Sequence, residues 1–129
     1  SETLAKEQGN VIKLEHNQFV STNRNAAVEL RITLECFGTD HKKQIIKALE
    51  KAGWHDAWPE ANGADAVREP SFHGFKGEMY KAKGKPGPID FIFLKGAGIK
   101  AVESHLVKDS VKGILPSDHY FLSADIVIE

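Results

Sequence analysis

The residues best suited to acid–base chemistry are the tripeptide Ser117-Asp118-His119 and the earlier Asp90. A histidine moves protons near neutral pH once a partner on one ring nitrogen fixes its tautomer, because the other nitrogen then faces the substrate. Asp118 adjoins His119, and Asp90 lies on a strand-like apolar run. These residues predict a hydrolytic site in which His119 meets a substrate or phosphate oxygen. The tripeptide also suits a turn, since Ser and Asp bond nearby backbone groups.

Four motifs give this tripeptide a context. They are, in chain order, Gly53-Trp54-His55-Asp56-Ala57-Trp58, Ser71-Phe72-His73-Gly74-Phe75, Ile89-Asp90-Phe91-Ile92-Phe93 and Ser117-Asp118-His119-Tyr120. Their order resembles the C-terminal half of the endonuclease/exonuclease/phosphatase superfamily, which has the deoxyribonuclease-I-like fold. In that family a helix ends in a glycine and "hDA", a loop carries "T-x-H-G-F", a strand reads "IDYIF", and "SDH-x-P" introduces the last strand. The resemblance covers about residues 24–129.

The resemblance implies a divalent-metal hydrolase of phosphodiesters or phosphomonoesters. By position, His119 would sit beside the scissile phosphate and Asp90 would orient it. Asp118 would lie at a Mg²⁺ or Mn²⁺ ion, in keeping with the preference of hard cations for oxygen ligands. Ser117 and His73 would contact the substrate. Asp90 also has a structural alternative, a hydrogen bond that only holds a loop, and His73 has the alternative of shaping its own loop.

The chain departs from the family pattern in ways that argue against turnover. Where the family has "GDFN", Cys36 stands in for the Asp and Gly38 for the Asn, so a carboxylate and an amide are lost. The family's first half, which supplies an Asn and a metal-binding Glu, has no room in 129 residues. His16, which precedes Arg24, is the candidate for the family's "THL" histidine. A non-catalytic scaffold or dimerisation module is therefore the alternative to an enzyme.

Composition predicts one soluble domain spanning residues 1–129. Hydrophobic residues make up 41% of the chain, enough for a core, and 17 basic against 18 acidic residues leave a net charge of −1, which gives no strong nucleic-acid signature. The single Cys36 excludes an internal disulfide and favours a reducing, cytoplasmic compartment. No apolar run reaches the ~18 residues that a membrane span needs.

The first half of the chain predicts two strands and two helices. Strands are expected at 11–14 and 32–37, and a brief helix at 26–30. A longer helix should start at Thr39 or Asp40 and end before Gly53, because Ile45, Ile46, Leu49 and Ala52 recur at helical spacing.

The second half predicts a long loop over 54–88, with His55 and Asp56 finishing the helix turn, followed by strands at 89–95, 99–107 and 120–129. The predicted fold is α/β, with one mostly antiparallel sheet of about five strands and helices on one face. The family resemblance makes this half of a four-layer αββα sandwich. An uncovered apolar sheet face predicts a homodimer or a complementing half-domain.

Overall fold

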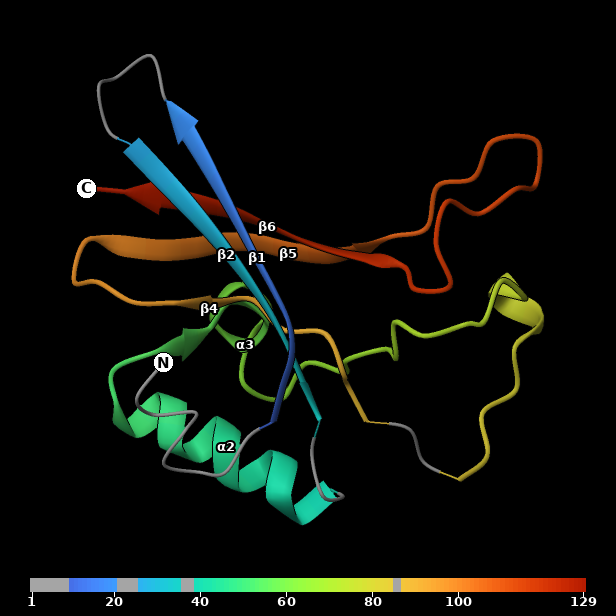
Figure 1. The fold of residues 1–129 in the computed structure, drawn as a ribbon, viewed down its shortest axis with the longest axis horizontal. Coiled ribbons are helices and arrows are strands. Elements are labelled where there is room, and N and C mark those ends of the chain that lie inside the picture. Colours follow the sequence, from blue (N-terminus) through green and yellow to red (C-terminus); the bar gives the residue numbers. More distant parts are fainter. Residues whose placement is uncertain (1–9, 21–25, 36–38, 85–86) are drawn as a thin grey trace. The chain divides into compact units, whose positions relative to one another are not determined.

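The computed structural model describes residues 10–20, 26–35, 39–84 and 87–129, of which the first two ranges are described by backbone alone (Figure 1). Contacts divide the chain into two compact units, Ser1–Ala52 and Gly53–Glu129. Cys36 and Gly38, which the resemblance aligns with an Asp and an Asn, lie outside the described residues.

The first unit contains an antiparallel pair of strands, β1 (Asn10–Val20) and β2 (Ala26–Glu35). The strand expected at 11–14 is confirmed and is longer than predicted. The brief helix expected at 26–30 is wrong, because those residues belong to β2. Apolar and polar residues alternate along β2 from Val28 to Leu34, and this period of two is that of a strand.

Helix α2 (Thr39–Lys51) follows in the same unit and confirms the helix predicted from the apolar stripe. Ile45 of that stripe is buried. Gly53 comes just after the helix with φ +93°, a left-handed conformation that glycine adopts without a steric penalty.

The second unit begins with β3 (His55–Asp56), α3 (Ala57–Asn62) and, further on, the 3₁₀ helix η1 (Gly77–Met79). The prediction of a long loop over 54–88 is therefore wrong for residues 55–62 and 77–79. His55 and Asp56 do not finish the preceding helix, since Asp56 caps the start of α3 by accepting a hydrogen bond from the Trp58 backbone N–H.

The strand predicted at 89–95 is reduced to β4 (Phe93–Leu94), which pairs antiparallel with β3. Its short length follows from its partner, because β3 stops where α3 begins at Ala57 and leaves no further strand to pair with. Asp90 thus lies in an irregular segment before β4 rather than within a strand.

Strands β5 (Ile99–Val107) and β6 (Phe121–Ile128) confirm the last two predicted strands and pair antiparallel (Figure 1). Helix α3 packs on β5. The core between them is made of small and aliphatic side chains, namely Ala57, Ala61, Ile92, Leu94, Ile99, Ala101 and Ala124. Ala57 and Ala61 lie one helical turn apart, so the helix can approach the strand closely.

The mixed α/β character and the antiparallel pairing are confirmed. The described strands hydrogen-bond two by two, as β1–β2, β3–β4 and β5–β6. The larger sheet of about five strands remains a prediction. Within the described ranges, no helix combines the length and apolar character needed to cross a bilayer.

Candidate functional site

The second unit brings together two of the residues that the sequence singled out for acid–base chemistry. The His119 Nδ1 atom lies 2.7 Å from Asp90 Oδ2, across 29 positions of sequence. An ionised carboxylate only accepts hydrogen bonds, so the imidazole donates through Nδ1–H. Both side chains are about a third exposed, 34% for His119 and 40% for Asp90. Among the described residues, the His119 side chain forms its hydrogen bond through Nδ1.

A backbone bridge places His119. Residues 71–73 run antiparallel to residues 118–120, with Phe72 opposite His119. The Tyr120 N–H donates to the Ser71 carbonyl at 2.8 Å, and the His73 N–H donates to the Asp118 carbonyl at 2.9 Å. The loop that resembles "T-x-H-G-F" is thus tied to the segment that resembles "SDH".

Ser71 is the residue of this site that sequence reasoning missed. Its hydroxyl is buried and donates a hydrogen bond to the same Asp90 oxygen that accepts from His119. The carboxylate is therefore held from two sides. The sequence motif could have indicated this residue, because Ser71 stands where the family pattern has Thr, and both residue types carry a hydroxyl group.

Ser117 and Asp118 form a local turn beside the pair. The Ser117 hydroxyl accepts from the His119 backbone N–H at 3.2 Å and donates to Asp118 Oδ1 at 3.4 Å. The Asp118 carbonyl accepts from the backbone N–H groups of His73 and Gly74. Both residues are partly buried next to His119. Substrate contact by Ser117 stays a prediction.

His73 is a core residue of this loop, with only 2% of its surface exposed. Its Nδ1 accepts from the Phe75 backbone N–H at 3.1 Å, which leaves the proton on Nε2, a buried atom without a hydrogen-bond partner in the described part of the chain. The ring packs on Tyr120 with a centroid separation of 4.3 Å. These contacts fit the loop-shaping alternative, and substrate binding by His73 remains untested.

The backbone of His16 lies in β1, opposite Leu30, in the other compact unit. Its proposed catalytic role remains a prediction. The metal prediction for Asp118 likewise stays open. The residues with described side chains contain no group of three or more His, Cys, Asp or Glu side chains that could hold a metal ion. Asp118 and its described neighbours therefore do not make a complete Mg²⁺ or Mn²⁺ site, which needs several oxygen ligands.

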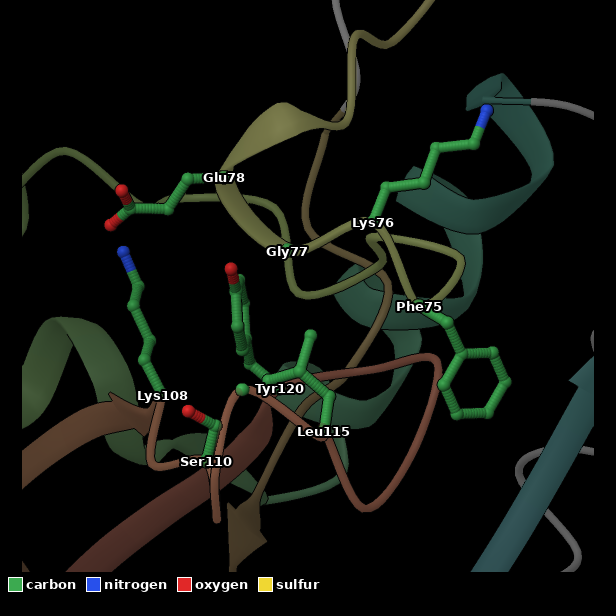
Figure 2. A pocket seen from close by; sticks show the side chains of 9 residues that line it. Phe75, Lys76, Gly77, Glu78, Lys108, Ser110, Leu115 and Tyr120 are labelled. Atoms are coloured by element: carbon green, nitrogen blue, oxygen red, sulfur yellow. The ribbon is translucent and has the colours of Figure 1, made fainter.

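A separate pocket of about 340 Å³ lies beside η1 (Figure 2). Its lining comprises Phe75, Lys76, Gly77, Glu78, Lys108, Ser110, Gly113, Leu115 and Tyr120. Successive side chains of an extended segment point to opposite sides, so Tyr120 faces this pocket while His119 faces Asp90. Neither member of the Asp90–His119 pair lines the pocket.

Lys108 is a positively charged residue of the pocket lining, and its contacts are well defined. A hydrogen bond from its ammonium to the Glu69 carboxylate raises the pKa of Lys108, against the opposing effect of burial. The same ammonium lies 5.4 Å from the centre of the Tyr120 ring, within cation–π range. Figure 2 shows the Glu78 carboxylate turned toward Lys108 and the Phe75 ring turned away from both. The lysine is therefore already engaged by the protein's own groups.

Comparison of the chain with protein-family models, with curated proteins and with solved structures found no match in any of the three.

Proposed function

We propose that this chain is a domain of the metal-dependent phosphoester hydrolase lineage represented by the endonuclease/exonuclease/phosphatase superfamily. The observation that carries the proposal is the 2.7 Å contact between His119 Nδ1 and Asp90 Oδ2. The resemblance assigned these two residues, far apart in sequence, to neighbouring roles in one site. Their contact supports that assignment.

The local architecture adds support, because three of the four motifs meet around this pair. Ser71 of the "SFHGF" segment bonds Asp90 of the "IDFIF" segment, and Asp90 bonds His119 of the "SDHY" segment. A group of motifs that shared only turn chemistry would have no reason to converge on one carboxylate. The proposed fold is accordingly half of an αββα sandwich.

The proposed role of each residue follows from its geometry. Asp90 accepts the Nδ1–H of His119, which fixes the orientation of the ring and leaves Nε2 as the nitrogen that would meet the substrate. Ser71 holds the Asp90 oxygen in place. The Nε2 atom then takes a proton or, when protonated, donates a hydrogen bond to a phosphate oxygen.

Mg²⁺ or Mn²⁺ remains the proposed cofactor. When bound, such an ion polarises a phosphoryl oxygen or activates a water molecule. The described residues do not by themselves complete its ligand set.

The test is hydrolysis of bis-p-nitrophenyl phosphate with and without Mg²⁺ or Mn²⁺. Turnover by the wild-type chain should require the metal and should fall roughly 100-fold or more in His119→Ala, the range of a lost acid–base group. His105→Ala is the matched control, because His105 is an exposed histidine on β5, and its activity should equal that of the wild type.

The alternative is a non-catalytic scaffold or dimerisation module, which the replacement of Asp and Asn by Cys36 and Gly38 favours. A phosphodiester titration followed by NMR at the ring nitrogens of His119 separates the two functions. Binding at His119 without turnover would establish a phosphate-binding scaffold. A folded wild-type protein with neither binding nor turnover would contradict a phosphoester role.

A further inference from the structure

Arg68 is the most extensively engaged charged side chain near the Asp90–His119 pair. Its Nη1 donates to Asp56 Oδ2 at 2.5 Å and its Nη2 to Asp56 Oδ1 at 3.4 Å. Only 14% of the Arg68 side chain and 8% of the Asp56 side chain are exposed. Two parallel hydrogen bonds to one carboxylate fix the plane of the guanidinium as well as its position.

The same guanidinium reaches the backbone of the candidate site. Its Nη2 also donates to the carbonyl oxygen of Asp90 at 3.2 Å. The Arg68 Cζ atom lies 4.5 Å from the centre of the Phe91 ring and 5.6 Å from that of Trp58. These rings pack around a cation that cannot be deprotonated in a protein, so the contact persists at any ordinary pH.

Asp56, the anchor of Arg68, is itself held in place. It pairs with Phe93 in the β3–β4 ladder, and its Oδ1 accepts from the Trp58 N–H at the start of α3. The Asp90 backbone lies in the irregular segment before β4, which the Ala57 N–H ties to the start of α3 through the Ile92 carbonyl at 2.9 Å. The hydrogen bond from the fixed guanidinium to the Asp90 carbonyl adds a restraint on the backbone two residues before Ile92.

We propose that Arg68 is a positioning residue of the Asp90–His119 pair. By fixing the Asp90 backbone to the start of α3, it holds the Asp90 carboxylate where His119 Nδ1 can donate to it. The importance of this role for chemistry rests on the proposed function. The hydrogen bond itself is measurable whether or not the protein turns over a phosphoester.

The test is NMR of the His119 ring in the ligand-free 129-residue chain, through the Nδ1–H proton and its exchange with water. Arg68→Gln removes the positive charge and the two hydrogen bonds to Asp56. Arg68→Lys keeps the charge but loses the planar guanidinium that makes two parallel hydrogen bonds. Arg68→Gln should speed exchange of the Nδ1–H about fivefold to tenfold or abolish its signal, the loss expected for one hydrogen bond of ordinary net strength. Arg68→Lys should give an intermediate rate.

Lys100→Gln is the matched control. It removes one positive charge in the same unit, at an exposed position of β5. Its Nδ1–H exchange should equal that of the wild type. An unchanged signal in a folded Arg68→Gln protein would overturn the proposal, and if that variant does not fold, an unchanged signal in Arg68→Lys would do the same.

The result is separable from the outcome of the hydrolysis assay. Loss of the Nδ1–H signal in the Arg68 variants, in a protein without turnover, would leave the positioning role standing and remove only its link to hydrolysis. An active protein whose His119 Nδ1–H signal is unchanged in the Arg68 variants would support the proposed function and contradict the positioning role of Arg68.

Discussion

At the scale of single residues, the candidate site depends on one carboxylate with several partners. Sequence reasoning identified Asp90 and His119 from their types and from the motifs around them, and these two residues are in contact. It did not identify Ser71 or Arg68. Both reach Asp90 through tertiary contacts, at separations of 19 and 22 residues, and for Arg68 no local pattern encodes such a contact.

The hydroxyl of Ser71 should contribute measurably to stability. Replacing Ser71 with Ala removes a buried hydrogen bond to Asp90 and should lower the free energy of unfolding by about 1–2 kcal/mol. Urea denaturation measures this change. Ser110→Ala, an exposed serine of the pocket, should stay within about 0.5 kcal/mol of the wild type. Equal effects of the two variants would show that the Ser71 hydrogen bond contributes nothing.

At the scale of elements, long strands and the long helix were predictable and short elements were not. Helix α2 and strands β5 and β6 are long enough for a helical or strand pattern to be recognised in their sequences. Helix α3 has only six residues, with Pro59 in its first turn, and is too short to show a helical period. It is defined instead by its Asp56 cap and by its packing on β5.

Glu60 is the side chain that ties α3 to a β-bulge in β5. Its Oε1 accepts the backbone N–H of Ala101 at 2.6 Å, next to the shift in register between Ala101 and Glu103. Glu60→Ala would leave a buried N–H unsatisfied and should cost about 1–3 kcal/mol in urea denaturation. Glu60→Gln keeps an acceptor and should cost less. A loss no larger than that of the exposed Glu103→Ala would contradict this role.

At the scale of the whole molecule, the described side chains of the candidate site belong to the unit Gly53–Glu129. The motifs that indicated the site all lie in this unit, and they carry no information on how the rest of the chain folds. The association of the chain with a second copy remains a proposal. Several large apolar side chains on β5 and β6 are exposed, namely Val102, Phe121, Ile126, Val127 and Ile128.

We expect the chain to form a homodimer through the face of β6 that carries Phe121 and Val127, because alternate residues of a strand share a face and exposed apolar patches are commonly covered in two-fold assemblies. Sedimentation equilibrium should give twice the mass of one chain. Phe121→Lys, at a side chain that is 50% exposed, should shift the protein toward the monomer. Val67→Lys, at an 86% exposed loop position, should not. A wild-type monomer at all accessible concentrations would rule out the dimer.

We propose that His119, oriented by Asp90, acts on a phosphoester. The measurement that decides this role is metal-dependent hydrolysis of bis-p-nitrophenyl phosphate by the wild-type chain and by His119→Ala. Turnover should require Mg²⁺ or Mn²⁺ and should fall roughly 100-fold or more in the variant. Equal turnover by the two proteins would rule out this role of His119, because the pair at 2.7 Å would then play no part in the reaction.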